Sequence, residues 1–201
     1  MPQPLIVHII DSLRVGGAQT HLLTMLREEV ATKRARHRVV SLFDDGPVGD
    51  EIRALGIPVE ALDLAPTLER RRFGAAAKQL QERLREERPD IVEAHLTYSR
   101  ILGLYAAWRV GVPQRIAFEH GDLYLTSPKF RLAHVVGQCF AHRIVVVSEA
   151  LAAWARHTYR LSRSKMVILH NCVDLERFRE GAVTPATDLN LPDAATKLVA
   201  V

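Results

Sequence analysis

The sequence predicts an α/β protein, with a Rossmann-like, doubly wound and mostly parallel sheet of about seven strands flanked by helices. Two observations predict this fold class. Short apolar runs alternate along the chain with segments whose apolar side chains recur at helical spacing. The apolar runs are also largely continuous, which is typical of strands that are buried on both faces of a parallel sheet. Such a sheet binds ligands at the carboxyl ends of its strands.

The first strands introduce the repeating unit. Leu5–Ile10 is a continuous apolar run apart from His8, and it predicts a buried strand. A polar turn that contains glycine follows over 11–17, and from Ala18 onward the apolar side chains fall at the spacing of a helix. The next unit repeats this order, with a strand over 38–43, a short helix over 48–55 and a third strand over 57–64.

A long helix is expected over 67–88, because its apolar side chains form one stripe while arginine, glutamate and glutamine fill the opposite face. Pro89 marks its end, and the stripe consists of Phe73, Ala77, Leu80 and Leu84. The rest of the chain continues the alternation. We expect strands over 90–96, 115–120, 143–148 and 166–169, and helices over 98–110, 128–141 and 149–159.

The pattern also predicts how the chain is divided into domains. The periodic elements fall within one domain over 1–180. The segment 181–196 contains glycine, proline and asparagine without periodicity, as expected of a linker between domains. The apolar pentapeptide 197–201 is expected to open a second domain, because so short a strand cannot form a core of its own.

Composition excludes several classes of protein. The 201-residue chain is 48% apolar and 25% charged, which suits a soluble globular domain. It has no apolar run near the roughly 20 residues of a membrane-spanning helix, and its first residues lack the pattern of a signal peptide. Cys139 and Cys172 lie far apart, so neither a disulfide framework nor a zinc ribbon is indicated. We expect a cytoplasmic protein.

The basic side chains give a net charge of +4 without forming one stripe of interleaved aromatic residues, so no nucleic-acid partner is expected. They cluster at 33–38, 70–72 and 156–165. Each cluster taken alone is most simply a solvated face. Arg70–Arg72 is also a candidate for peripheral contact with an anionic surface, which would place the protein at the inner face of the membrane.

Gly16 and Gly17 follow the first strand and open the first helix. The free backbone N–H groups and the positive end of a helix favour a phosphate or another oxyanion at such a turn. The dinucleotide fingerprint GxGxxG is not met because Ala18 stands at its second glycine, and the absence of GK[ST] excludes a P-loop. A tight turn without a ligand is the alternative.

Histidines end two of the predicted strands. His95 and His120 close the fourth and fifth strands, so both are expected at the edge that binds ligands. Histidine there can hydrogen-bond sugar hydroxyls or phosphate, although each one alone could be structural. None of the nine histidines shows an HxH, HExxH or HxxxH spacing with a neighbouring carboxylate, so no metal site is expected.

Ser148 ends the sixth predicted strand and starts a helix. Its hydroxyl could contact a ligand or cap that helix, and capping is a common role of serine at this position. No GxSxG surrounds Ser148, so a serine hydrolase is not supported.

Taken together, these motifs resemble those of the GT4-type, or group 1, glycosyltransferases, over nearly the whole chain. That family commonly has a GGA[EQ] turn after the first strand, strands that end in H and in HG, VS after the sixth strand, and NGVD followed by Phe. Gln19 and Cys172 replace the commoner Glu and Gly of these motifs. The matching segments are Gly16-Gly17-Ala18, Ala94-His95, Glu119-His120-Gly121, Val147-Ser148 and His170-Asn171-Cys172-Val173-Asp174.

The resemblance implies the N-terminal half of a GT-B fold, with the nucleotide-sugar-binding domain beyond Val201. It implies retaining, metal-independent transfer of a sugar from a nucleotide diphosphate sugar to a glycan, lipid or small-molecule acceptor, with no cofactor besides this co-substrate. His120 would be the catalytic residue, through positioning and charge stabilisation. This half alone is expected to be inactive. The implied substrate-binding residues are Gly16, Gly17, His95, Glu119, Gly121, Ser148 and Asn171.

Two alternatives remain. A GT-B sugar-nucleotide epimerase would share the fold and the cleft but would need no acceptor. A non-catalytic ligand-binding domain with Rossmann-like topology would need neither a second domain nor turnover, and the apolar pentapeptide at 197–201 speaks against it.

Overall fold

The computed structural model describes residues 3–121, 128–159 and 163–172. Within these ranges, seven strands form one sheet in the order β3-β2-β1-β4-β5-β6-β7, and every neighbouring pair is parallel. The predicted fold class is therefore confirmed. The strands are β1 (Leu5–Ile10), β2 (Arg36–Ser41), β3 (Val59–Ala61), β4 (Ile91–His95), β5 (Gln114–Glu119), β6 (Arg143–Val146) and β7 (Met166–Ile168).

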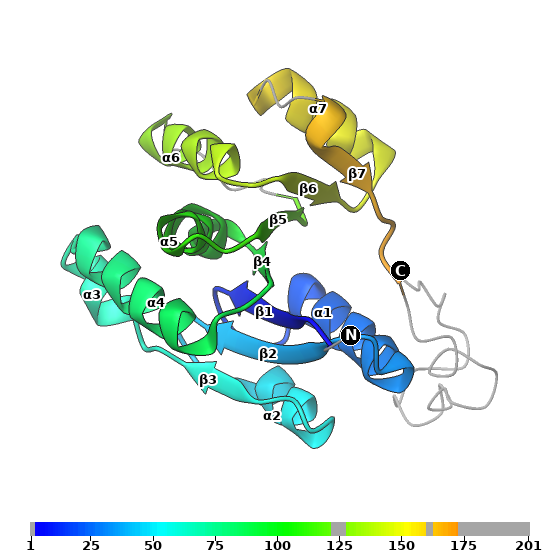
Figure 1. Ribbon diagram of the computed structural model, residues 1–201. Helices are drawn as coiled ribbons and strands as arrows, with labels where there is room; N and C mark the ends of the chain where they lie inside the picture. Colours follow the sequence, from blue (N-terminus) through cyan, green and yellow to red (C-terminus); the bar gives the residue numbers. More distant parts are fainter. Residues whose placement is uncertain (1–2, 122–127, 160–162, 173–201) are drawn as a thin grey trace, which may run out of the picture.

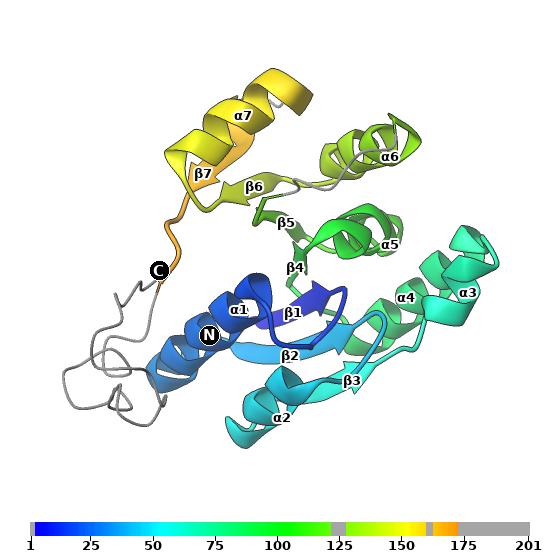
Figure 2. The ribbon, with the colours of Figure 1, turned by 180° about the vertical axis from the view of Figure 1, so that it is seen from behind.

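Helices cover both faces of this sheet (Figures 1 and 2). One face packs against α1 (Gly17–Thr32) and α2 (Pro47–Ala54), and the other packs against α4 (Phe73–Glu87) and α5 (Leu104–Val110). None of the helices in the described part of the chain is long and apolar enough to cross a membrane. The remaining helices are α3 (Ala65–Glu69), α6 (Pro128–Cys139) and α7 (Glu149–Tyr159), with a π-helical turn at Ser99–Gly103 and a 3₁₀ turn at Arg163–Lys165.

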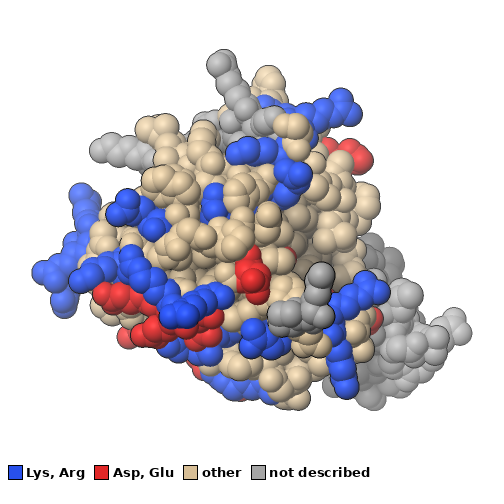
Figure 3. Space-filling view, viewed as in Figure 1, with Lys and Arg blue, Asp and Glu red and all other residues tan. Residues whose placement is uncertain are grey.

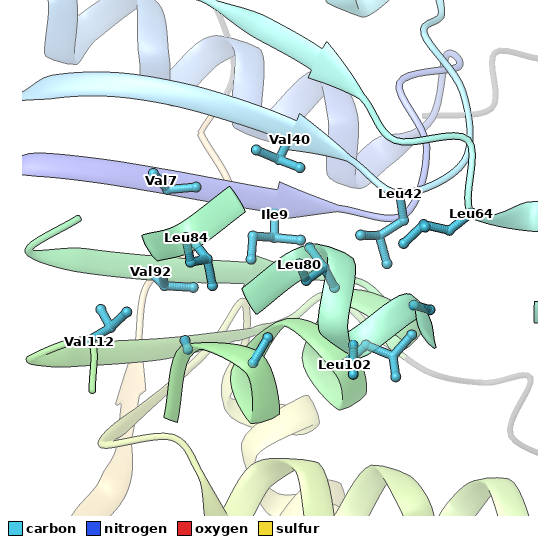
Figure 4. Packing of buried hydrophobic residues seen from close by; sticks show 14 of the residues in the cluster. Val7, Ile9, Val40, Leu42, Leu64, Leu80, Leu84, Val92, Leu102 and Val112 are labelled. Carbon is cyan, nitrogen blue, oxygen red and sulfur yellow. The ribbon is translucent and has the colours of Figure 1, made fainter. Parts of the chain in front are cut away.

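A large apolar core lies between the sheet and helices α4 and α5 (Figure 4). Val7 and Ile9 of β1 pack there with Leu80 and Leu84 of α4, and all four are almost completely buried. Burying a leucine of this kind contributes about 1.5–3 kcal/mol. Because side chains alternate along a strand, the even positions of β1 face α1 instead, so His8 lies on the same side of the sheet as α1.

The prediction of one continuous helix over 67–88 is wrong, because the structure has two helices there, α3 and α4. Arg71 has a positive φ of 55°, and its N–H donates to the carbonyl oxygen of Leu68 at 2.8 Å, which closes a turn between the helices. The break lets Leu68 and Ala76 pack on the same core. Phe73, which the apolar stripe predicts to be buried, begins α4 and is 45% exposed.

Other boundaries differ by less. The strand expected over 57–64 pairs only through Val59–Ala61, and the strand expected over 143–148 ends at Val146. The helix expected over 98–110 begins as the π-helical turn. The helices expected over 48–55, 128–141 and 149–159 are confirmed to within two residues. The expected linker and second domain, over 181–201, lie outside the described residues.

Candidate functional site

The carboxyl ends of β1, β4 and β5 meet at one edge of the sheet. Ile10 of β1 pairs with His95 of β4, and His95 pairs with Phe118 of β5, so all three strands end at the same level. Helix α1 begins at this edge, because the turn after β1 leads directly into Gly17. The edge therefore combines a helix N-terminus with the polar residues that follow the strands, as ligand sites of such sheets do.

The two glycines at the start of α1 leave its N-terminus open. Gly16 is the N-cap residue, and no side chain caps the helix. A Cβ added to Gly17 would meet no other atom within 4 Å, so a ligand can approach the backbone closely there. The first turn of α1 contains no acidic residue, so the positive end of its dipole is not neutralised locally. This turn is suited to an anionic group.

His95 and His120 are brought together, as their positions at strand ends predict. Nδ1 of His95 lies 3.3 Å from Nε2 of His120, and the two rings are stacked with centroids 5.6 Å apart. Their exposure differs, however. His120 is half-buried, whereas His95 is completely buried and also stacks on Phe118. In this arrangement the buried His95 ring packs against the His120 ring, and a substrate contact of His95 stays a prediction.

Burial makes both rings neutral at pH 7. Desolvation, with smaller effects of His21 and Arg100, lowers the pKa of His120 to about 4. Desolvation also holds the pKa of His95 well below its usual range. A neutral imidazole donates a hydrogen bond through one nitrogen and accepts one through the other. At pH 7, His120 is thus suited to forming hydrogen bonds and not to donating a proton from a charged ring.

Glu119 lies beneath the site instead of in it. Its carboxylate is completely buried and forms an ion pair with Arg100, and its other oxygen accepts a hydrogen bond from the Gly121 N–H at 3.4 Å. Gly121 has a φ of 108°, a conformation that favours glycine. Glu119 and Gly121 therefore fix the backbone on both sides of His120.

Comparison with known proteins assigns this chain to a family. The family described as Glycosyltransferase Family 4 matches residues 15–177, which is most of the chain. The chain belongs to Glycosyltransferase Family 4. The comparison with curated proteins gives no match.

Solved structures share the fold of this family 4 domain. HepE of Anabaena, solved with UDP and glucose, has a TM-score of 0.73 at 18% identity over 94% of this chain. A glycosyltransferase from Rickettsia africae has a TM-score of 0.70 at 15% identity over 96% of it. A UDP-N-acetylglucosamine 2-epimerase from Rickettsia bellii has a TM-score of 0.61 at 16% identity over 85% of it. The chain covers 50%, 51% and 45% of these proteins, about half of each.

The two remaining predicted site residues of the family 4 domain are Ser148, which follows β6, and Asn171, which follows β7. The Ser148 hydroxyl accepts a hydrogen bond from the Leu151 N–H at 3.1 Å, so it caps α7. Asn171 follows β7 and is exposed. The rest of the matching motif, Val173 and Asp174, lies outside the described residues. Substrate contacts of Ser148 and Asn171 stay predictions.

Sequence reasoning missed Asp11, which immediately follows β1. Its half-buried carboxylate accepts hydrogen bonds from the N–H groups of Tyr98 and Ser99, at 3.0 and 2.6 Å, and from the Ser99 hydroxyl at 2.7 Å. Burial nevertheless raises its pKa, because desolvation outweighs these hydrogen bonds. Asp11 thereby ties the end of β1 to the π-helical turn. The strand-end rule that selects His95 would also have selected Asp11.

His21 is the second residue that sequence reasoning missed. It lies on α1, is 4% exposed, and its ring meets the His120 ring edge-on at a centroid distance of 5.5 Å. His21 lies four residues after Gly17, one helical turn further along α1. This spacing places it on the face of the helix that covers the sheet, and it links the start of α1 to His120.

Proposed function

We propose that this chain is the acceptor-side half of a retaining, metal-independent glycosyltransferase, which moves a sugar from a nucleoside diphosphate sugar to a glycan, lipid or small-molecule acceptor. Family membership supports the transferase class. The observation that carries the proposal is the contact between His21 of α1 and His120, because it puts the open helix N-terminus and a strand-end histidine at one edge. The second domain would close the cleft over this edge.

The start of α1 is the proposed contact for the donor phosphates or the acceptor. HepE was solved with UDP and glucose, which supports a nucleoside diphosphate sugar as the donor. Gly17 would let a phosphate oxygen approach the backbone N–H groups, whereas the Gln19 side chain fills the space beside Gly16. The helix dipole would stabilise part of the charge that develops on the leaving diphosphate. Such stabilisation requires no metal ion at the reacting centre.

His120 would hold the donor sugar or the reacting hydroxyl by a hydrogen bond. Its pKa of about 4 keeps it neutral at pH 7, so positioning is its proposed task and general-base catalysis is not. His95, Glu119 and Gly121 would act through His120, since the first two are completely buried.

The test uses the full-length protein together with the second domain that the proposal requires. Release of nucleoside diphosphate is measured with a panel of nucleotide sugars and acceptors. We expect His120→Ala to lower kcat by about 100-fold or more, as the loss of one positioned hydrogen bond does in other enzymes. The matched control is His157→Ala, an exposed histidine of α7, which is expected to keep full activity.

Other outcomes would contradict the proposal. Equal activity of the His120→Ala and His157→Ala variants would show that His120 has no role in catalysis. Interconversion of the nucleotide sugar without any acceptor would indicate an epimerase. Binding of nucleotide sugars without turnover would indicate a non-catalytic domain. Turnover by residues 1–201 alone would contradict the expectation that this half is inactive.

Peripheral membrane contact is proposed as an accessory property. Figure 3 shows Lys and Arg side chains gathered over the α3 and α4 side of the molecule. Arg70–Arg72 are exposed there and adjoin Phe73, which borders an apolar hollow of about 350 Å³ with Tyr105 and Phe140. Cations beside exposed apolar side chains suit an anionic lipid surface.

The membrane test is co-sedimentation with vesicles of anionic and of neutral lipid. We expect R70E/R71E/R72E to weaken binding to anionic vesicles by at least about tenfold, because each cation near such a surface contributes about 1 kcal/mol. Reversal of a single charge at exposed Lys78 of α4 is the control and should have a smaller effect. Unchanged binding of the triple variant would remove this proposal.

A further inference from the structure

A row of histidines crosses the sheet on the face that α1 covers. His37 of β2, His8 of β1 and His95 of β4 lie side by side, with ring centroids 5.4 Å apart for His37 and His8 and 5.8 Å apart for His8 and His95. His120 follows next to His95. This row extends from the candidate site into the interior of the protein, and the proposed function uses only His120 and His95 at one end of it.

Three ligand atoms in this row converge in the interior. His8, Glu93 and His95 each offer one ligand atom, and these atoms all lie within 4.8 Å of one another. Both histidines are completely buried, and the Glu93 side chain is 12% exposed. No described residue gives His8 Nδ1, Glu93 Oε2 or His95 Nε2 a hydrogen bond of acceptable geometry. Buried polar atoms without partners are costly, so this cluster requires an explanation.

We propose that His8, Glu93 and His95 bind one Zn²⁺ ion within the sheet. Two imidazole nitrogens and a carboxylate oxygen are a ligand set that zinc uses. Ligands about 2.0–2.2 Å from a tetrahedral ion lie about 3.3 Å from each other. His8 Nδ1 and Glu93 Oε2 are 3.1 Å apart, close to this spacing although they are poorly aligned for a hydrogen bond. Three protein ligands leave the fourth position to a water molecule.

The sheet itself fixes the three ligands. His8 of β1 pairs directly with Glu93 of β4, and His95 is two residues further along β4 on the same face. The ligands come from adjacent parallel strands about 85 residues apart in sequence, which is why local spacing motifs predict no metal site. The register of β1 and β4 brings them together.

The remaining ring nitrogens support the same assignment. His8 Nε2 lies 3.1 Å from His37 Nδ1, and His95 Nδ1 lies 3.3 Å from His120 Nε2. Metal-bound histidines usually donate their other N–H to a neighbouring acceptor. With zinc on Nδ1 of His8 and on Nε2 of His95, the protons lie on the opposite nitrogens and donate to His37 and to His120. The ion thereby also fixes the orientation of His120.

A surface pocket lies next to the outer end of the histidine row, at His37. A pocket of about 320 Å³ is lined by Ile6, Glu29 and His37, and it lies beside the α1 face of β1 and β2. Glu29 Oε2 lies 3.3 Å from His37 Nε2, and these two residues form a second group of converging ligand atoms with His8. The proposed zinc site lies in the interior of the sheet, so it does not depend on the proposed transfer activity.

The test begins with the unmodified protein after removal of metal by a chelator. Calorimetric titration with Zn²⁺ should show one ion per chain, and zinc should raise the Tm, because an ion that binds only the native state stabilises it. Co²⁺ added instead should give the visible absorption of a tetrahedral nitrogen and oxygen site. Absence of Zn²⁺ binding, or binding without a change in Tm, would overturn the proposal.

Variants identify the ligands. Glu93→Gln keeps the size of the side chain while it removes the carboxylate, and it is expected to weaken zinc binding by at least about 100-fold, as is His95→Asn. His37→Asn, which removes the ring that accepts the His8 Nε2–H, should weaken binding by about 10–100-fold. Control variants His142→Asn and His157→Asn, which alter histidines outside the cluster, should bind zinc as the unmodified protein does.

Two results would contradict the assignment. Binding that survives both Glu93→Gln and His95→Asn would show that zinc binds elsewhere. Loss of binding in Glu29→Gln with retention in Glu93→Gln would move the site to the outer group. If His95→Asn fails to fold, zinc binding by Glu93→Gln and the effect of zinc on the Tm of the unmodified protein still test the assignment. Neither measurement requires the removal of a buried ring.

Discussion

Arg100 and Glu119 form an ion pair in which neither side chain is exposed to solvent. Arg100 belongs to the π-helical turn at Ser99–Gly103, and Glu119 is the last residue of β5. The Arg100 Nε–H also donates to the carbonyl oxygen of Leu96, at 2.9 Å, just after β4. This pair therefore connects the ends of two strands directly beneath His120, and the candidate site rests on it.

Arg100→Met should lower the free energy of unfolding by about 3–5 kcal/mol, because it leaves the Glu119 carboxylate buried without this cation. The double variant Arg100→Met/Glu119→Gln should lose much less, since it removes both charges. Urea unfolding of the unmodified protein, both single variants and the double variant gives the coupling. Strictly additive losses would show that the pair is not energetically coupled.

Gly137 of α6 packs tightly against the π-helical turn. A Cβ at Gly137 would lie 3.0 Å from the Arg100 carbonyl oxygen and 3.0 Å from the Ile101 Cα. These are backbone atoms that cannot easily move, so Gly137→Ala should cost about 1–3 kcal/mol. Gly74→Ala in α4 is the matched control, because its Cβ would meet nothing within 4 Å. In thermal unfolding, a lower Tm for Gly74→Ala than for Gly137→Ala would contradict this interpretation of the packing.

Gly17→Ala separates the stability of α1 from its proposed contact with a ligand. The new methyl group has open space, and Gly17 is the first residue of the helix, so the Tm should stay unchanged or rise slightly. If a phosphate or acceptor approaches this backbone, the same methyl should raise KM in the full-length transferase by about tenfold or more. An unchanged KM together with an unchanged Tm would remove Gly17 from the site.

His21 should make the domain less stable in acid. Burial lowers its pKa below the usual 6.5, so the folded state favours the neutral ring. Its contribution to stability is therefore present above pH 6.5 and is lost as the pH falls through the lowered folded-state value. In the metal-free protein, His21→Leu should lose less unfolding free energy between pH 7 and about pH 5 than the unmodified protein does.

The control for this pH series is His157→Asn, which changes an exposed ring of α7. It should follow the unmodified protein, because an exposed ring is solvated in both the folded and the unfolded state. Guanidinium unfolding at several pH values measures both variants. If His21→Leu and the unmodified protein lose stability in parallel, another group accounts for the acid sensitivity.

The sequence by itself predicts the fold class, because the apolar runs and helical stripes reflect burial on both faces of a parallel sheet. Leu5–Ile10 is predicted and found as β1. The sequence also predicts that His95 and His120 lie at the same edge of the sheet, and in the structure their rings are in contact. The apolar runs, helical stripes and strand ends are local patterns, and the order of the elements along the chain is enough to interpret them. Family membership agrees with the resemblance that the same motifs indicate.

Tertiary structure decided the rest, because the remaining features depend on contacts between residues far apart in the chain. The positive φ of Arg71 divides a helix whose apolar stripe reads as continuous. The buried ion pair between Glu119 and Arg100 joins residues of two different elements, and no local pattern predicts it. The register of β1 against β4 brings His8, Glu93 and His95 together. No spacing within a single element carries that information, since side chains from two strands meet only when the sheet has formed.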